Sequence, residues 1–496
     1  MKFKNAMILL TCIFLLSACN QETATMKVFE TSREGNLLTE VSDFETSEPT
    51  TIISIDRNTS KQTLVGFGAA FTEASAYLMN ELGTENRREI IEAYFSEQGS
   101  NYSLMRTHMN SCDFSLTNYS YSPVEGDTEL EHFSIEEDRD DLIPFIKEAQ
   151  ETSSGGFKLF ASPWTAAPWM KDNNSWVGGK LLPMYYPTWA KFFSKYVDAY
   201  ESEGIPIWGF TVENEPHGNG NSWESMLYSP DEMVDFVKNH LGPTLEKDGK
   251  GDKIIMGYDQ NREGIKEWAD VMYANEENSR YFDGMAIHWY ESTVSYFPEM
   301  LEYAHEKAPG KLLIETEGCI DNQVPVWRDD EWYWKKEATD WGYYWRQDDQ
   351  KYLHPKYAPA HRYARDIIGC LNHWVEGWVD WNMVLDRQGG PNWFKNWCIA
   401  PVIADTENDE IYFTPLYYIM SHFSKFMRPG AEVLASTISN EDLMSAAVLN
   451  EDGSLIIAVF NEGEQPITYS VEMEDQNLSL SIPAQALQTI VLDPNE

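Results

Sequence analysis

The chain has 496 residues, enough for two or three domains, and a formal charge of −43. A field of this sign repels nucleic acid phosphates and anionic membrane surfaces, which excludes polyanions as partners and favours a neutral or cationic substrate. Aromatic residues make up 14% of the sequence. That composition suits a bulky core, and it also suits a surface that stacks against flat or ring-shaped ligands.

The first residues are typical of a bacterial export signal. A basic start, MKFK, precedes an apolar run at 6–16 that is too short to span a bilayer permanently. The following LSAC, which ends at Cys19, resembles the lipobox of bacterial lipoproteins. We therefore predict a signal peptide over 1–18 and lipid on Cys19 as the membrane anchor of an exported outer-membrane lipoprotein, at the cell surface or the periplasmic face. The alternative is an ordinary secretion signal in which Cys19 is incidental.

Four cysteines follow Cys19, namely Cys112, Cys319, Cys370 and Cys398. They form no CxxC pair, so neither a zinc ribbon nor a thioredoxin-type site is indicated. A chain of this size does not need disulfides for stability, and we expect buried thiols.

Residues 19–50 are polar and predict a lipid-anchored tether with a possible first strand from about residue 27. Residues 51–63 predict a strand that joins a later sheet. From residue 64 short apolar runs alternate with amphipathic segments; the runs are 64–67, 103–108, 157–161, 207–212, 253–257, 284–288, 311–314 and 377–381. Eight strands alternating with helices predict a (β/α)8 TIM barrel over 64–424. A doubly wound sheet is the rival, but its glycine-rich fingerprint is absent.

Past about residue 425 the pattern changes to short alternating strands. The strand candidates are 432–434, 446–449, 455–460, 467–471 and 478–480, with a turn at NEDG, 450–453. This pattern predicts an antiparallel β-sandwich domain over 425–496, which would borrow the strands before residue 64.

Two strand exits carry acidic residues. In the stretch FTVENEPHG, 210–218, strict alternation along the strand turns Glu213 and Glu215 toward the barrel axis, with Glu215 at the rim. In KLLIETEG, 311–318, the same alternation places Glu315 and Glu317 inward, with Glu317 at the rim. Barrel enzymes build their sites where strands end. Rim glutamates on strands four and seven would face each other, and carboxylates about 5 Å apart suit a retaining glycosidase.

Several ordered segments carry a specific resemblance. These are CDFS at 112–115, SPWTAAPWMK at 162–171, TVENEP at 211–216, HWY at 288–290, ETEGC at 315–319, GWVDWN at 377–382, GGPNW at 389–393 and HFSKF at 422–426. With these segments the chain resembles glycoside hydrolase family 30, which includes glucosylceramidases and β-1,6-glucanases. The resemblance runs from about residue 64 to the C-terminus.

The resemblance implies roles for individual residues. It makes Glu215 the general acid/base and Glu317 the nucleophile, with Asn214 holding the sugar 2-hydroxyl. Alternation would turn Asn214 outward, so the strand must lose its regularity there. The remaining residues that it implies are Asp113, Trp164, Trp381 and Asn396 around the terminal glucose, Tyr290 as a donor to Glu317, Arg106 as a charge partner of a glutamate, and His288 as an orienting group or a core histidine.

Residues 321–354 are longer than in the lysosomal member of the family and rich in tryptophan, which suits either an extra glucan subsite or surface packing. We interpret the chain as a retaining β-glycosidase, specifically a β-1,6-glucanase (glucan endo-1,6-β-glucosidase), although both internal and terminal cleavage fit the sequence. A glucosylceramidase-like or small-substrate β-glucosidase is the alternative, and a non-catalytic carbohydrate-binding protein is a different class. The chemistry requires no metal or organic cofactor, and the oligomeric state stays open.

Overall fold

The structure is a computed structural model that describes residues 26–45, 47–219, 222–322, 358–474 and 476–494. The predicted leader, Cys19 and most of the tryptophan-rich segment lie outside these residues. Among the described helices, none combines the length and the apolar character needed to cross a bilayer.

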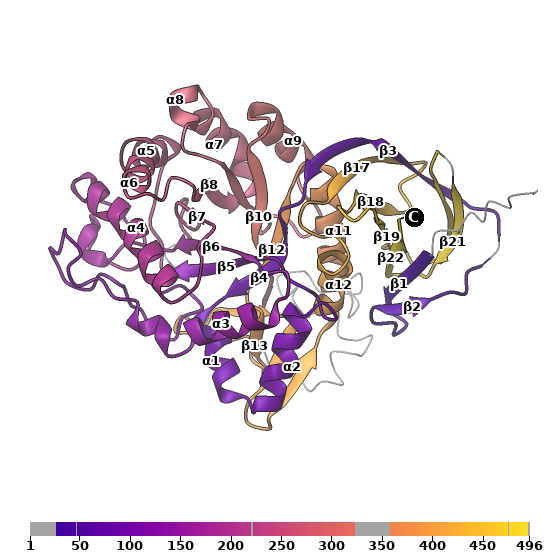
Figure 1. Ribbon diagram of the computed structural model, residues 1–496, viewed down its shortest axis with the longest axis horizontal. Helices are drawn as coiled ribbons and strands as arrows, with labels where there is room; N and C mark the ends of the chain where they lie inside the picture. The colour runs from indigo at the N-terminus through magenta and orange to yellow at the C-terminus, as the bar shows by residue number, and fades with distance from the viewer. Residues whose placement is uncertain (1–25, 46, 220–221, 323–357, 475, 495–496) are drawn as a thin grey trace, which may run out of the picture.

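Eight parallel strands close into a barrel, which confirms the predicted fold and excludes the doubly wound sheet (Figure 1). In chain order they are β4 (Gly66–Phe71), β5 (Leu104–Met109), β6 (Lys158–Pro163), β7 (Gly209–Thr211), β8 (Ile254–Asn261), β9 (Gly284–His288), β10 (Leu312–Gly318) and β12 (Gly377–Asp380). Each strand pairs with its neighbour in this order, and β12 closes the ring by pairing with β4. All eight predicted runs overlap these strands.

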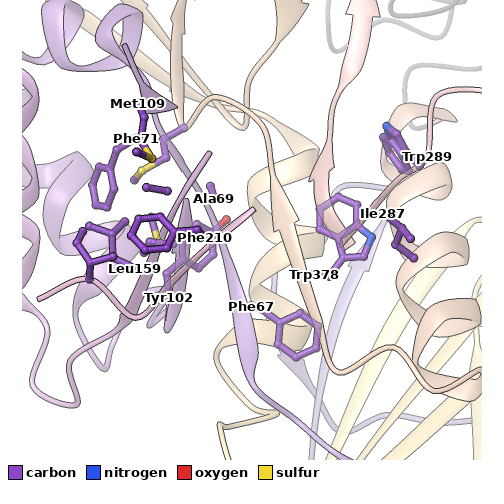
Figure 2. Close-up of a cluster of buried hydrophobic side chains, with 14 of the residues drawn as sticks. Phe67, Ala69, Phe71, Tyr102, Met109, Leu159, Phe210, Ile287, Trp289 and Trp378 are labelled. Atoms are coloured by element: carbon purple, nitrogen blue, oxygen red, sulfur yellow. The ribbon is translucent and has the colours of Figure 1, made fainter. Parts of the chain in front are cut away.

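Helices surround the barrel and cover the outer face of its strands. They are α1 (Glu73–Glu81), α2 (Thr84–Phe95), α3 (Leu142–Thr152), α4 (Tyr186–Ser202), α5 (Pro230–Phe236), α6 (Gly242–Lys247), α7 (Ile265–Met272), α8 (Glu276–Ser279), α9 (Pro298–Lys307), α11 (Ala358–Asn372) and α12 (Pro415–Ser424). Figure 2 shows the large side chains that fill this layer. Phe210 of β7, for example, lies edge-on to Phe193 of α4 with ring centroids 5.1 Å apart. Phe210 therefore points from its strand toward the surrounding helices.

The interior of the barrel has two zones. A compact apolar cluster, with Leu104, Phe160, Met256, Ala286, Ile314 and Val379 as buried members, fills the interior. Further along the strands Arg106, Thr211 and Asp259 are also fully buried, but they form a hydrogen-bonded network. The polar zone therefore lies toward the carboxyl ends of the strands, where TIM barrels carry their active sites.

The second domain is built on a nine-stranded sheet in the order β2-β1-β22-β19-β18-β17-β3-β20-β21. Its strands are β1 (Met26–Ser32), β2 (Thr39–Val41), β3 (Thr51–Thr63), β17 (Glu432–Ile438), β18 (Met444–Leu449), β19 (Leu455–Asn461), β20 (Ile467–Glu472), β21 (Asn477–Ile482) and β22 (Ala486–Leu492). Pairing is antiparallel except between β3 and β20, which run parallel. No hairpin fixes the direction of β3, since it comes from the segment before the barrel.

Helix α12 connects the two domains. It lies between the barrel and the sandwich in Figure 1. Its His422 is fully buried, with Nδ1 2.8 Å from the hydroxyl of Thr489 on β22 and Nε2 2.9 Å from that of Thr31 on β1. Burial lowers the pKa of His422 to about 3, so the ring is neutral and two threonine hydroxyls satisfy it. The N-terminal strand is thereby tied to the barrel.

Two smaller sheets follow the last strands of the barrel. Strands β13 (Val384–Asp386), β15 (Val402–Asp405) and β16 (Glu410–Phe413) form one sheet. Strands β11 (Ile320–Asn322) and β14 (Trp397–Ile399) form an antiparallel pair directly after β10. This pair brings the segment around Asn396 next to the end of the strand that carries Glu317.

Candidate active site

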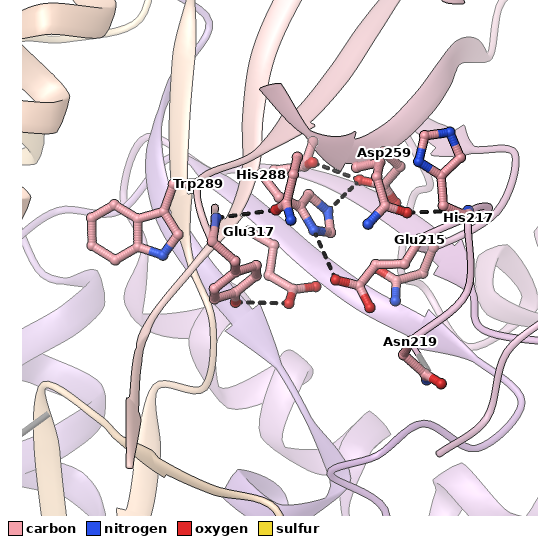
Figure 3. A network of polar contacts seen from close by, with 12 residues as sticks. Glu215, His217, Asn219, Asp259, His288, Trp289 and Glu317 are labelled. Atoms are coloured by element: carbon pink, nitrogen blue, oxygen red, sulfur yellow. Dashed lines mark hydrogen bonds and ion pairs between the residues drawn. The ribbon is translucent and has the colours of Figure 1, made fainter. Parts of the chain in front are cut away.

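A cavity of about 260 Å³ opens at the carboxyl ends of the barrel strands. Glu215 and Glu317 both line it, and Figure 3 shows the two side chains near each other, Glu317 from β10 and Glu215 from the loop after β7. The other lining residues are Asp113, Trp164, Asn214, Gly218, Asn219, Trp223, Gln260, Asn261, Tyr290, Cys319, Trp381, Asn396 and Cys398. Every residue that the resemblance assigned to substrate binding therefore lies in this wall.

Glu215 reaches the cavity because the backbone leaves the strand early. Strand β7 ends at Thr211, and Glu215 adopts a left-handed φ of 50°. Its backbone N–H donates to the carbonyl of Asp259 at 3.0 Å, which holds this turn against β8. Asn214 and Glu215, which strict alternation would send to opposite faces, consequently both line the cavity. The loss of regularity that the sequence required at Asn214 is confirmed.

Glu213 has a different environment. Its side chain is fully buried, and neither carboxylate oxygen has a hydrogen-bond partner among the described residues. Burial raises the pKa of Glu213 well above its ordinary value, a rise that the charge of Lys171 only partly opposes. This glutamate is therefore a neutral structural group outside the cavity wall.

A β-bulge on β10 separates the two glutamates of the second exit. The register with both neighbouring strands shifts between Glu315 and the following residues. Ile314 belongs to the interior cluster, whereas Glu315 forms a buried ion pair of 2.6 Å with Arg262, which also holds Asp366 of α11. The predicted inward position of Glu315 is therefore wrong, because the alternation restarts after the bulge. Glu317 is turned into the cavity as predicted.

A buried charge network supports Glu317. The Arg106 guanidinium donates to Glu317 at 3.0 Å, to Asp259 at 2.8 Å and to the side-chain oxygen of Asn214 at 2.9 Å. Burial would raise the pKa of Asp259, but Arg106 and His288 outweigh it and hold this pKa at about 2. Asp259 is therefore an anion that balances the buried guanidinium.

His288 is the second cation of the network. Its Nε2 lies 2.9 Å from Asp259, and its Nδ1 lies 3.7 Å from Glu215 (Figure 3). Burial alone would lower the pKa of His288, but the carboxylates of Glu317 and Asp259 raise it to about 10. Burial also raises the pKa of Glu317, and the charges of His288 and Arg106 oppose that rise. The imidazolium therefore favours the ionised form of the nearby carboxylates.

Tyr290 completes the contacts of Glu317. Its hydroxyl donates to Glu317 Oε1 at 2.8 Å, as predicted, while Arg106 donates to the other oxygen, Oε2. Each carboxylate oxygen thus receives one hydrogen bond, which fixes the plane of the carboxylate. A carboxylate held in one orientation loses less entropy when it reacts.

Another part of the cavity wall is suited to a sugar ring. Trp164 and Trp381 stack with ring centroids 5.1 Å apart, and the Arg106 guanidinium lies 5.0 Å from the Trp164 ring. Asn396 donates to Asp113 Oδ2 at 3.0 Å, whereas Asp113 Oδ1 is buried without a partner among the described residues. That oxygen is an available acceptor for a ligand hydroxyl, and indole rings provide an apolar face for a pyranose.

The sequence did not predict one residue of the charge network and several residues of the cavity wall. Asp259 was missed because the predicted strand ended at 257, whereas β8 continues to Asn261 through a register shift. Trp223, Cys319 and Cys398 also line the cavity without having been singled out for it. The four cysteines of the described residues are buried and free of disulfides, as expected. Among the described residues no group of His, Cys, Asp and Glu gathers as metal ligands.

Comparison with known proteins decides the family. A glycosyl hydrolase family 30 TIM-barrel domain matches residues 64–427, and a glycosyl hydrolase family 30 β-sandwich domain matches residues 430–490. The chain belongs to glycosyl hydrolase family 30. This family 30 glycosidase carries its two rim glutamates in the barrel domain.

Relatives of this family 30 glycosidase differ in their named activities. Lysosomal acid glucosylceramidase of Mus musculus is 32% identical over 424 residues, which covers 84% of this chain and 78% of the relative. The crystal structure of SrfJ from Salmonella typhimurium has a TM-score of 0.84 at 29% identity, covering 95% of this chain and all of that one. The structure of an endo-β1,6-glucanase matches with a TM-score of 0.80 at 26% identity, and the match covers 94% of this chain and 99% of the glucanase. The family is thus shared by enzymes with glycolipid and polysaccharide substrates.

Proposed function

We propose that this chain is a retaining β-glycosidase that cleaves β-1,6-glucosidic bonds, with Glu317 as nucleophile and Glu215 as general acid/base. The observation that carries the proposal is the arrangement of the two glutamates in one cavity: Glu317 is held by Arg106 and Tyr290, whereas Glu215 lies beside the His288 ring on the other strand exit. A fixed anion and a second carboxyl group on different strands are the components of double displacement.

In the first step the ionised Glu317 attacks the anomeric carbon while Glu215 gives its proton to the glycosidic oxygen. The carbon–oxygen bond to the leaving sugar breaks, and a covalent glycosyl ester forms on Glu317. In the second step Glu215, now a carboxylate, removes a proton from water, which attacks the same carbon and releases Glu317. Two inversions restore the β configuration.

The contacts of the wall explain how the sugar is held for this attack. Asn214 receives a hydrogen bond from Arg106 through its oxygen, so its amide N–H groups remain to donate to the 2-hydroxyl. Asp113 would accept from hydroxyls at the far side of the ring through its unpartnered oxygen. Trp164 and Trp381 would cover the apolar face. The cavity of about 260 Å³ lies below the roughly 300–1,000 Å³ of drug-sized ligand sites and suits one sugar ring at the reacting position.

Two features favour a glucan as the substrate. The chain's net charge of −43 is compatible with a neutral polysaccharide, and the cavity wall includes Trp223, whose indole would provide a stacking surface for the leaving sugar. The similarity to an endo-β1,6-glucanase over 94% of the chain supports the linkage. The second candidate, a glucosylceramidase-like or small-substrate β-glucosidase, is favoured by the 32% identity to a glucosylceramidase.

Two matched variants test the proposal. Glu317→Gln removes the nucleophile, whereas Glu315→Gln, two residues earlier, changes a side chain that lies outside the cavity and keeps an oxygen that can accept from Arg262. On pustulan, a β-1,6-glucan, and on an aryl β-glucoside, Glu317→Gln should lose at least about 10³-fold in kcat, and Glu315→Gln should retain activity. Binding without turnover by the wild type would instead indicate a carbohydrate-binding protein.

A substrate panel separates the two candidate activities. β-1,6-, β-1,3- and β-1,4-glucans, glucosylceramide and an aryl β-glucoside are compared by kcat/KM. Preference for pustulan supports the glucanase, and preference for the glycolipid or the small glucoside supports the second candidate. The products from pustulan report the cleavage mode, since early oligosaccharides indicate internal cutting and glucose alone indicates terminal cutting.

The same proposal includes lipid anchoring at Cys19, for which the LSAC sequence is the support. Cys19→Ala expressed in a bacterial host should move the protein from the membrane fraction to the soluble fraction and remove the mass of the lipid. An unchanged distribution between the fractions would contradict the anchor.

A further inference from the structure

Two thiols meet in the wall of the cavity. The Sγ of Cys319 donates to the Sγ of Cys398 at 3.2 Å, although 79 residues separate them in the sequence. Both cysteine side chains are almost completely buried. The little surface that they expose lies in the wall of the cavity that holds Glu215 and Glu317. A small solute that enters the cavity therefore reaches the sulfur pair.

The β-ladder imposes this contact. In the antiparallel pair of β11 and β14, Asp321 lies opposite Cys398. Cys319 immediately precedes β11 and Cys398 lies within β14, so the pairing of these two strands holds the two residues close together. Backbone pairing next to Cys319 thus supports the sulfur–sulfur distance of 3.2 Å.

We propose that Cys319 and Cys398 form a dithiol that hydroperoxides oxidise to a disulfide, and that this disulfide lowers the glycosidase activity. One thiolate attacks an oxygen of hydrogen peroxide, which breaks the O–O bond, forms a sulfenic acid and releases the first water once the thiol proton is transferred. The second sulfur then attacks the sulfenic sulfur and expels hydroxide, which takes the remaining thiol proton as the second water. Each sulfur loses one electron, and the peroxide gains two.

The disulfide would act on both walls of the site. An S–S bond of about 2.05 Å requires the sulfurs to approach by roughly 1 Å. On one side Cys319 lies two residues after Glu317, and the Tyr290 hydroxyl that donates to Glu317 also lies 3.5 Å from Cys319 Sγ. On the other side Cys398 lies two residues after Asn396, the partner of Asp113. A displacement of about 1 Å in such groups can cost a hundredfold in rate.

Cys370 provides a matched control among the described cysteines. Burial raises the thiol pKa of both Cys112 and Cys370 well above the ordinary value. Cys370 lies on α11 outside the barrel and donates to Asp366 at 3.4 Å. Cys370 does not line the cavity that holds Cys319 and Cys398, so Cys370→Ala should leave the peroxide response unchanged.

The test treats the full chain with hydrogen peroxide and then with dithiothreitol, and follows peptide masses and aryl β-glucoside hydrolysis. We expect a peptide linked through Cys319 and Cys398, at least a tenfold loss of kcat/KM, and recovery of both on reduction. Cys398→Ala and Cys319→Ser should resist peroxide relative to their own untreated activity, with folding checked by thermal unfolding, while Cys370→Ala should respond like the wild type.

Three results would overturn the proposal. They are loss of activity without the linked peptide, the linked peptide without loss of activity, and equal peroxide sensitivity of the wild type and Cys398→Ala. Peptide mapping needs no substrate, so its result is independent of which β-glucoside the enzyme prefers.

Discussion

Arg106 donates through Nη1 to Oε2 of Glu317 at 3.0 Å, and both side chains are buried. A buried guanidinium beside a buried carboxylate is stable only with further partners, and here Asp259 supplies the compensating charge at 2.8 Å. The pair therefore works as part of a triad in which Arg106 orients the carboxylate and Asp259 keeps the arginine in place. This relationship connects the stability of the barrel mouth to the reactivity of Glu317.

The two glutamates of the ENE sequence should behave differently. Glu215→Gln should lower kcat on pustulan by about 10²–10⁴-fold, because the leaving oxygen is no longer protonated. The loss should be smaller on a 2,4-dinitrophenyl β-glucoside, whose leaving group needs no proton. Glu213→Gln is the matched control, since burial keeps the Glu213 carboxyl neutral and glutamine resembles that form. Comparable losses in both variants would contradict the assignment.

His288 should set the acid limb of the pH–rate profile. Its charge opposes the rise that burial causes in the pKa of Glu317. His288→Gln removes that charge, so the pKa of Glu317 should rise further, and the acid limb of kcat/KM should move to higher pH. His108→Gln is the control, because burial lowers the pKa of His108 to about 4 and its ring carries no charge at neutral pH. An acid limb that moves equally in both variants would rule out the electrostatic explanation.

The ionisation of Asp259 should make the free energy of unfolding depend on pH. Its pKa of about 2 lies below the ordinary 3.8, so its stabilising effect is fully present above pH 3.8 and is lost as the pH falls through about 2. Asp259→Asn should lower the free energy of unfolding at pH 6 by about 3 kcal/mol, because Arg106 and His288 lose their anion. Thermal unfolding across pH 6 to 3 should show the gap to the wild type narrowing below pH 4. A gap that is constant with pH would indicate a packing effect alone.

Trp223 should contribute to binding of the leaving sugar. It lines the cavity from the loop that carries Glu215, and Phe394 holds its ring edge-on at 5.4 Å. Trp223→Ala should reduce kcat/KM on pustulan by about tenfold through the lost stacking surface, and Trp223→Phe should restore part of it. β-Glucosyl fluoride has no leaving sugar, so its hydrolysis should change little. An equal loss on the fluoride would indicate a general collapse of the wall.

The barrel and both acidic exits could be predicted from the sequence because strand periodicity and chain order are local signals. Details that depend on irregular backbone geometry could not be predicted in this way. Glu315 was placed inward by alternation, and the bulge on β10 reverses this. Asp259 follows Tyr258, and both adopt left-handed φ values within β8, which no local pattern indicated. Asn396 and Asp113 are 283 residues apart, so only the family resemblance could bring them to one site before the structure did.

The most direct test of the account is the anomeric configuration of the azide products formed by two alanine variants. With 2,4-dinitrophenyl β-glucoside and sodium azide, Glu215→Ala should still form the glycosyl ester on Glu317, and azide should replace it from the opposite face to give the β-glucosyl azide. Glu317→Ala should instead admit azide into the space of the missing carboxylate and give the α-glucosyl azide. Proton NMR distinguishes the two. The opposite assignment, with α-azide from Glu215→Ala and β-azide from Glu317→Ala, would contradict the proposed roles of both glutamates.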